Sequence, residues 1–277
     1  MLIRYGCEIG ITVPSATPAI CLLDVHPERR RDISFENSLT TSPATQQMTY
    51  LDSFGNRCRR FIAPPGNLTL HLDGTIVDSG IADDRDTDAR EVPVEALPHY
   101  VLGFLLGSRY CETDRLSQTA WDMFGGLQPG WSRVQAICDF VHSHLTFGYQ
   151  HARATRTALE AFGERQGVCR DFAHLMITLC RCLNIPARYV NGYLGDIGVP
   201  ADPAPMDFSA WTEVFLENRW YTFDARHNTP RIGRIVVARG RDATDVPLIN
   251  TFGPHVLHTF KVWTDEQPAS AMRPAVA

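Results

Sequence analysis

The spacing of apolar residues changes partway along this chain, and that change limits the folds open to it. In residues 2–13, LIRYGCEIGITV, apolar side chains alternate with others, which is typical of a half-buried β-strand. From Cys169 to Leu183 they recur at helical spacing, which indicates an amphipathic helix that ends ahead of Pro186. Strands, then helices, then strands again, without β–α–β alternation, predict an α+β protein with an antiparallel sheet.

The N-terminal region carries several short strand signals. Residues 49–64 predict two strands around a Phe-Gly-Asn turn, and the pair Asp73-Gly74 after alternating leucines predicts a hairpin. Short strands at this spacing favour a small β-sandwich-like domain. The acidic, proline-bearing stretch 78–98 has no periodicity and is interpreted as a linker. We therefore expect an N-terminal β domain in residues 1–90 and a core domain in residues 91–277.

The core domain opens with helices and ends with strands. A helix is predicted over residues 131–145 and a shorter one over residues 155–162. Strands are predicted over residues 187–194, 210–216 and 220–224, the last two joined by a tight Glu-Asn-Arg turn.

Composition excludes several classes of function. Of the 277 residues, 44% are hydrophobic and 21% are charged, which is enough apolar material for a substantial core. The net charge is −5, which gives no excess of basic residues for binding phosphates, so no nucleic-acid partner is expected. No apolar run is long enough to span a bilayer, and the N-terminus lacks the apolar segment of a signal peptide. The expected location is the cytoplasm, without membrane association.

The eight cysteines do not form a metal-binding pattern. None belongs to a CxxC pair, and none is grouped with histidines at zinc-ligand spacing, so no metal is predicted. In a reducing cytoplasm most are expected to be small buried residues, including Cys180 and Cys182.

Cys169 differs because it follows Gly167 and opens the predicted helix. The positive end of the helix dipole and the unpaired backbone N–H groups are expected to lower the pKa of its thiol. The same N–H groups can stabilise the oxyanion of an acyl-transfer intermediate. Gly167 would let the chain turn sharply and leave room for a substrate backbone. Taken alone, the pattern also fits a buried structural cysteine.

A cysteine nucleophile requires a base and a group that orients the base. Ser209 and Asp224 fall on the two adjacent antiparallel strands and are expected to lie toward the same end of the hairpin. Serine has no side-chain pKa near neutrality, so it cannot exchange protons as an imidazole does.

Four stretches occur in an order that points to a family: GVCRDFAHL, IPARYVNGY, AWTEVFLENRWYTFDARHN and RIGRIVVARGRDATDV. Together they resemble the bacterial transglutaminase-like family, whose core has the papain-like cysteine protease fold. The stretch DSFGNRCRRFIAPPG resembles the N-terminal domain that often precedes this core. The resemblance implies a helix that carries the nucleophile and packs on an antiparallel sheet. It also implies a Cys-His-Asp triad that acts on amide bonds, with no metal or organic cofactor.

Carried over by motif, Cys169 is the nucleophile and Asp224 the orienting carboxylate. The family's His-Ala-Trp appears here as Ser209-Ala210-Trp211, so the departure falls on the general base. The substrate cleft is assigned to four residues: Gly167, Tyr149, Gln150 and Trp211. Within that set, Tyr149 and Gln150 are candidate oxyanion donors. Trp211 also suits the core of the hairpin. The expected partner is a peptide or protein substrate, and the oligomeric state stays open.

The serine leaves three explanations open. The chain is a natural member that binds a peptide or protein without turnover, or it is an inactivated form of an active acyltransferase. Alternatively, His227, three residues beyond Asp224, replaces the missing base. The simpler interpretation of His227 is a loop histidine that is hydrogen-bonded locally. The expected activity is that of a strongly weakened cysteine amidase or peptidase that forms a thioester, with hydrolysis favoured over acyl transfer.

Overall fold

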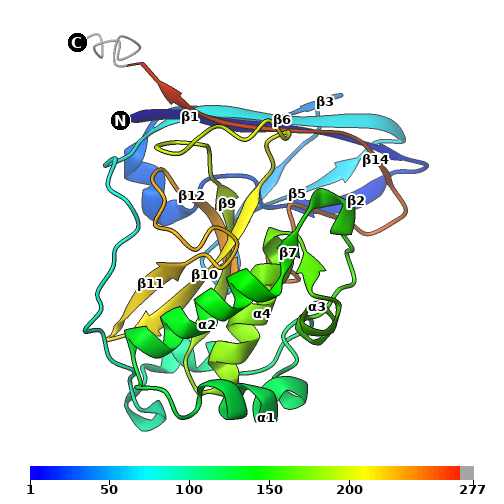
Figure 1. Ribbon diagram of the computed structural model, residues 1–277. Coiled ribbons are helices and arrows are strands. Elements are labelled where there is room, and N and C mark those ends of the chain that lie inside the picture. The colour runs from blue at the N-terminus through cyan, green and yellow to red at the C-terminus, as the bar shows by residue number, and fades with distance from the viewer. Residues whose placement is uncertain (269–277) are drawn as a thin grey trace.

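The structure of the protein, a computed structural model, describes residues 1–268 and combines three four-stranded antiparallel sheets with four α-helices. Figure 1 shows β1, β6 and β14 across one end of the molecule and the helices gathered at the other. The strands are β1 Leu2–Val13, β2 Thr17–Cys21, β3 Ile33–Ser42, β4 Met48–Leu51, β5 Arg57–Ala63, β6 Gly66–Val77, β7 Thr146–Phe147, β8 Gln166–Gly167, β9 Ala187–Tyr193, β10 Ser209–Leu216, β11 Arg219–Phe223, β12 Ile235–Gly240, β13 Ile249–Thr251 and β14 Val256–Gln267. The helices are α1 Thr113–Phe124, α2 Trp131–His144, α3 Ala158–Glu164 and α4 Cys169–Cys182.

Two sheets form the N-terminal module. Their strand orders are β14–β1–β6–β3 and β13–β2–β5–β4, and every neighbouring pair is antiparallel. Alternate residues of β1 and β6, such as Ile3, Ile9, Leu68 and Leu70, are fully buried in one core with residues of β2 and β5. The α+β class with a sandwich-like N-terminal module is confirmed.

The predicted hairpin at Asp73-Gly74 is wrong, because β6 continues without a break from Gly66 to Val77. A β-carbon at Gly74 would lie 2.7 Å from the hydroxyl oxygen of Tyr5 on the neighbouring strand. The glycine therefore makes room for the Tyr5 side chain and does not form a turn.

The C-terminal strands return to the N-terminal module. β14 pairs along β1, with Trp263 opposite Gly6, and β13 pairs with β2. The sequence assigns residues 91–277 to one core domain, whereas these two strands lie in the sheets of residues 1–90. Residues 269–277 of that predicted domain lie outside the described residues. Because the ends of the chain share a sheet, the first ninety residues do not contain the whole module.

The core is built on the sheet β11–β10–β9–β12, against which α4 packs. The hydroxyl of Thr212 on β10 donates to the carbonyl oxygen of Ala173 on α4 at 3.5 Å. The tight turn between β10 and β11 is formed by Glu217 and Asn218 with φ of 46° and 65°, as the primed hairpin turns require. Helix α1 was not predicted, although its buried residues Leu116, Ala120 and Phe124 recur every fourth position.

The acidic stretch 78–98 contains one short 3-10 helix, Val94–Ala96, and runs along one side of the molecule in Figure 1. Its carboxylates are bound by the core. Asp83 pairs with Arg234 at 2.8 Å, and Asp86 accepts a hydrogen bond from the Tyr221 hydroxyl at 2.9 Å. The linker is therefore attached to the core along its length.

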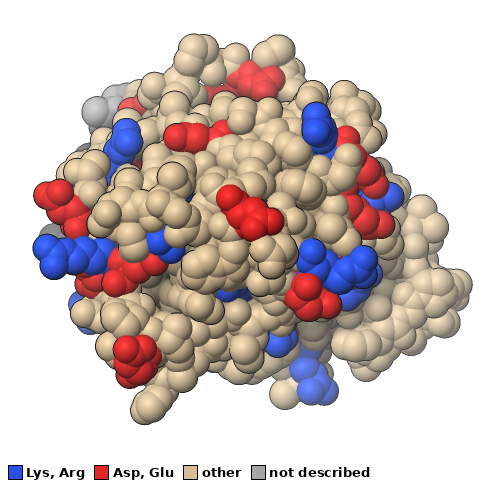
Figure 2. Space-filling view, turned by 60° about the horizontal axis from the view of Figure 1, so that its bottom comes forward, with Lys and Arg blue, Asp and Glu red and all other residues tan. Residues whose placement is uncertain are grey.

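On the face shown in Figure 2, acidic and basic side chains are interspersed. Among residues 1–268, no helix has both the length and the apolar character needed to cross a bilayer.

Candidate active site

Cys169 is the first residue of α4 and its side chain is partly buried. The sulfur donates to the carbonyl oxygen of Phe208 at 3.9 Å, and the backbone N–H of Ala210 points back at the sulfur. These two contacts place the thiol against the beginning of β10. Ser209 lies between Phe208 and Ala210 in the sequence, so Cys169 contacts both neighbours of position 209.

The pKa of the Cys169 thiol is raised to about 11, chiefly by burial and then by the nearby Asp207 carboxylate. The charge of Arg226 and the N–H of Ala210 act in the opposite direction but do not compensate. At neutral pH only about one thiol in 10,000 is ionised. The expectation that the helix start lowers this pKa is wrong, because desolvation and a like charge outweigh the helix dipole here.

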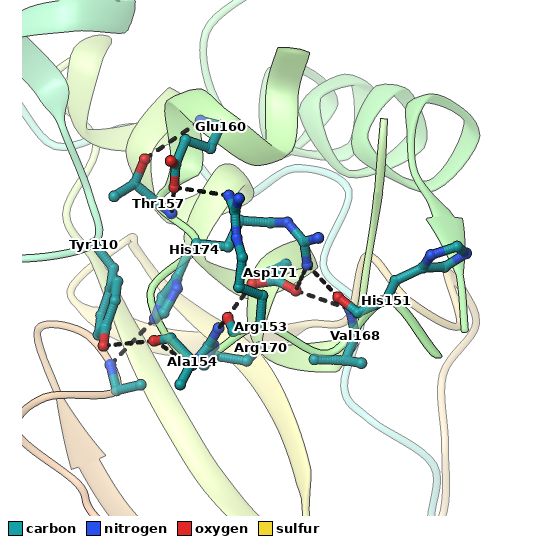
Figure 3. Close-up of polar contacts among 12 residues, drawn as sticks. Tyr110, His151, Arg153, Ala154, Thr157, Glu160, Val168, Arg170, Asp171 and His174 are labelled. Carbon is teal, nitrogen blue, oxygen red and sulfur yellow. Dashed lines mark hydrogen bonds and ion pairs between the residues drawn. The ribbon is translucent and has the colours of Figure 1, made fainter. Parts of the chain in front are cut away.

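A buried ion-pair network fixes the beginning of α4 (Figure 3). An oxygen of Asp171 accepts the backbone N–H of Val168 at 2.9 Å and the guanidinium of Arg156 at 3.0 Å. Its other oxygen accepts Arg170 at 3.2 Å. Arg156 also donates to Glu164 at 3.0 Å, which ties α3 to α4. Asp171 therefore caps the helix, and the network holds Cys169 in place.

The residues assigned to the substrate cleft lie in different surroundings. A β-carbon at Gly167 would lie 2.6 Å from that of Asp171, so this glycine makes room for the capping side chain. Gln150 hydrogen-bonds its neighbour His151 at 3.3 Å. Trp211 is buried with the Arg234 guanidinium 4.8 Å above its ring. Of this set, Tyr149 alone lines one of the two cavities described next.

Two cavities meet at Ser209. The first, here called the nucleophile cavity, measures about 570 Å³ and is lined by Cys169, Ser209 and a mostly apolar wall that includes Tyr189, Leu257 and Phe260. The second, the polar cavity, is smaller and is lined by Ser209 together with Tyr149, Asp196, Asp202, Arg226 and His227. Asp207 lines both. The cleft is therefore apolar on the cysteine side and charged on the other.

Ser209 begins β10 and is only 4% exposed. Its hydroxyl oxygen is buried and has no hydrogen-bond partner among the described residues. An unpaired buried hydroxyl is unfavourable, so a polar group that reached this point from either cavity would gain a hydrogen bond.

Asp224 follows β11 and is buried. One oxygen accepts the backbone N–H groups of Arg226 and His227, and the other accepts Arg234 and the Nδ1 of His227, each at 2.9 Å. Burial alone would raise the pKa of this carboxyl, but the Arg234 charge and the His227 contact hold it well below its usual range. Asp224 is therefore an ionised carboxylate that already binds an imidazole.

The sequence did not single out Asp207 or Arg226, although their charges act directly on the thiol. Both could have been found by position, since Asp207 is two residues before Ser209 and Arg226 is two residues after Asp224. His174, in contrast, is fully buried; its Nε2 accepts the backbone N–H of Ala243 at 3.2 Å, which is a structural role. Within residues 1–268, no three His, Cys, Asp or Glu side chains gather as metal ligands would.

Known proteins share this arrangement in sequence and in fold. The sequence profile of the Transglutaminase-like superfamily matches residues 117–225, a range that contains Cys169, Ser209 and Asp224. An uncharacterised protein of Mycobacterium leprae is 33% identical over 237 residues, which cover 76% of this chain and 77% of that protein. An uncharacterised protein of Mycobacterium tuberculosis (strain H37Rv) is 28% identical over 144 residues, 49% of this chain and 46% of that protein. Among solved structures, a candidate cysteine protease from Cytophaga hutchinsonii has a TM-score of 0.82 at 29% identity and covers 96% of this chain and 90% of its own.

Proposed function

This chain belongs to the transglutaminase-like superfamily, and from that premise we propose that it is a cysteine amidase or peptidase whose activity is strongly reduced by Ser209. The observation that carries the proposal is the thiol of Cys169, which lies at a helix start in the same cavity as the residue at the base position. The sulfur would attack the carbonyl carbon of a peptide or isopeptide bond. The C–N bond would break, the amine would leave with a proton, and water would hydrolyse the thioester.

The weak activity follows from proton transfer. The thiol is protonated at neutral pH, and the hydroxyl of Ser209 has no titration near neutrality with which to take up its proton. The leaving amine then also lacks a donor at this position. The helix N-terminus and the cavity still supply binding and oxyanion stabilisation, which by themselves give a residual rate.

A peptide-binding module without turnover is the second candidate, and the raised thiol pKa favours it. The largely apolar nucleophile cavity would then hold a segment of peptide or protein without acylation. For either function we propose a cytoplasmic location, a peptide or protein partner and no nucleic-acid partner, in agreement with the composition and net charge.

Trapping the acyl-enzyme tests the choice between these functions. The protein is incubated with a peptide library, and intact mass spectrometry is used to find a thioester that Cys169→Ala abolishes. Ser209→His should raise peptide hydrolysis by about 100-fold or more, because general acid–base catalysis contributes on that scale. If neither the natural chain nor Ser209→His forms a thioester on Cys169, the amidase proposal fails and the binding module stands.

A further inference from the structure

We propose that His227, held by Asp224, is the acid–base catalyst that serves Cys169 in place of the residue missing at position 209. The proposal rests on the proposed amidase function and identifies the group that moves the proton. It is carried by three observations: the contact between the imidazole and the orienting carboxylate, the place of the imidazole in the cleft, and the unpaired hydroxyl between imidazole and thiol.

The first observation is that the family's orienting carboxylate does bind a histidine. Nδ1 of His227 lies 2.9 Å from Asp224, and the same carboxylate accepts the backbone N–H of His227 at 3.3 Å. The backbone N–H of Asn228 closes the turn onto the carbonyl oxygen of Asp224 at 2.7 Å. Because the Asp224 carboxylate can only accept, this contact assigns the proton of the neutral ring to Nδ1. The lone pair of the ring is then on Nε2. That is the tautomer a base requires.

The carboxylate does not need the imidazole for its own charge balance. Arg234 is buried beside it and donates to the same oxygen at 2.9 Å. Two backbone N–H groups satisfy the other oxygen. A loop histidine that served only to neutralise Asp224 would therefore be redundant. The contact instead orients the ring.

The second observation is the position of the ring. The side chain of His227 is 22% exposed and lines the polar cavity, in which Ser209 and Asp207 also lie. These two residues line the nucleophile cavity as well, so the cavity of the imidazole and the cavity of the thiol share position 209.

The third observation is the buried hydroxyl of Ser209, which has no partner among the described residues. It lies on the boundary between the two cavities and can both donate and accept. A hydroxyl there can bond the Nε2 of His227 or the amide of a bound substrate, whereas an aliphatic side chain could do neither.

In the proposed first half-reaction, Nε2 of His227 takes the proton from the Cys169 sulfur as the sulfur bonds to the carbonyl carbon of the amide. The C–N bond then breaks, its electron pair stays with nitrogen, and Nε2 returns the proton to the leaving amine. In the second half, Nε2 takes a proton from water and the oxygen bonds to the thioester carbon. The C–S bond then breaks with its electron pair on sulfur, Nε2 returns the proton to the sulfur, and the carboxylic acid leaves.

The pH dependence of this step depends on the charges that face the ring. Besides Asp224, they are Asp196, Asp202, Asp207, Arg226 and Arg231, with the phenol of Tyr149. The three aspartates besides Asp224 lie in the loop before β10, and the two arginines lie in the segment after β11. Neutralising one of them changes the charge around the ring, whereas only the loss of the imidazole removes the proposed base.

The test compares His227→Gln with His151→Gln, a histidine substitution outside both cavities, in the full-length protein. Two quantities are followed: acylation of Cys169 by a peptide thioester or amide library, and alkylation of Cys169 by iodoacetamide from pH 5.5 to 10, each located by peptide mass. We expect His227→Gln to slow acylation by about 100-fold or more with little change in KM. Alkylation of Cys169 at neutral pH should be slower in His227→Gln than in His151→Gln, whereas at high pH, where the thiol itself ionises, the two rates should converge.

Equal melting temperatures of His227→Gln and His151→Gln exclude unfolding as the cause of a slower rate. In a third variant, His227→Ala, added imidazole should restore part of the acylation rate. Unchanged acylation and an unchanged alkylation profile in His227→Gln would overturn the inference while leaving Cys169 as the nucleophile. If no variant is acylated, the amidase function fails, and alkylation still decides whether His227 activates the thiol.

Discussion

At position 209 an imidazole would place a base beside the Cys169 sulfur, and a hydroxyl does not. In the family triad, an imidazolium beside the sulfur can stabilise a thiolate. Here burial is the chief cause that raises the pKa of the Cys169 thiol; the carboxylate of Asp207 adds to it, and the guanidinium of Arg226 opposes it. The resting thiol is therefore protonated.

Removing the opposing charge should make the thiol more acidic. In Asp207→Asn the Cys169 pKa is expected to fall by about one unit, a typical effect of one nearby charge. Because the thiolate fraction rises as this pKa falls, alkylation of Cys169 at pH 8 should become about tenfold faster. Iodoacetamide labelling followed by peptide mass measures the rate. The control is Asp202→Asn, an acid that lines the polar cavity only; if both variants label at the natural rate, burial alone sets the pKa.

At the scale of elements, the geometry of the nucleophile depends on how α4 begins. Asp171 is 1% exposed and holds Val168, Arg156 and Arg170 (Figure 3). Arg156 is itself buried and reaches Glu164 on α3. The first turn of α4 is therefore fixed from its own backbone and from the preceding helix.

Asp171→Asn should be strongly destabilising, because it removes the buried carboxylate that pairs with Arg156 and Arg170 and leaves Arg156 only the more exposed Glu164. Breaking a buried pair in this way typically costs about 3–5 kcal/mol. Urea unfolding measures the loss, and Cys169 labelling should become faster as the helix start loosens. Lys261→Met removes the exposed pair between Lys261 and Glu8, and should cost less than about 1 kcal/mol. Equal losses in the two variants would mean that the network does not fix α4.

At the scale of the whole molecule, the cleft is completed by the end of the chain. β14 pairs with β1 in the N-terminal module and places Leu257 and Phe260 in the wall of the nucleophile cavity. These two side chains are 51% and 39% exposed, although they belong to a sheet with a large core. Apolar groups left accessible beside a nucleophile suit an apolar segment of a peptide.

Phe260→Ala should weaken the binding of peptides with bulky apolar side chains by about tenfold, which corresponds to about 1.4 kcal/mol. Fluorescence titration of labelled peptides into Cys169→Ala protein measures binding without turnover. In the Ser209→His background the same substitution should raise KM and leave kcat nearly unchanged. The matched control is Phe252→Ala, which removes a phenylalanine that is 65% exposed and does not line the cavity. Equal affinities for both variants would show that the β14 wall does not contact the peptide.

The elements of the site could be predicted because they depend on local patterns. The apolar spacing after Cys169 indicates α4, and the short apolar runs 210–216 and 220–224 around a tight turn indicate the hairpin that begins at Ser209 and is followed by Asp224. The order of the motifs places these three residues at one end of the core. Gly74 shows the limit of such reasoning, since an Asp-Gly pair fits a turn until Tyr5 packs against it.

Properties that depend on neighbours distant in the sequence could not be predicted in this way. The thiol pKa follows from burial and from Asp207, the contact of Asp224 with both Arg234 and His227 follows from how the segment after β11 folds back, and the cavity wall comes from β14. Local periodicity follows from which side chains face inward, so the helix and the strands could be predicted from the chain alone. Charge, solvation and the shape of a cavity arise from groups that meet only after folding, and these set the acidity of the Cys169 thiol and its surroundings.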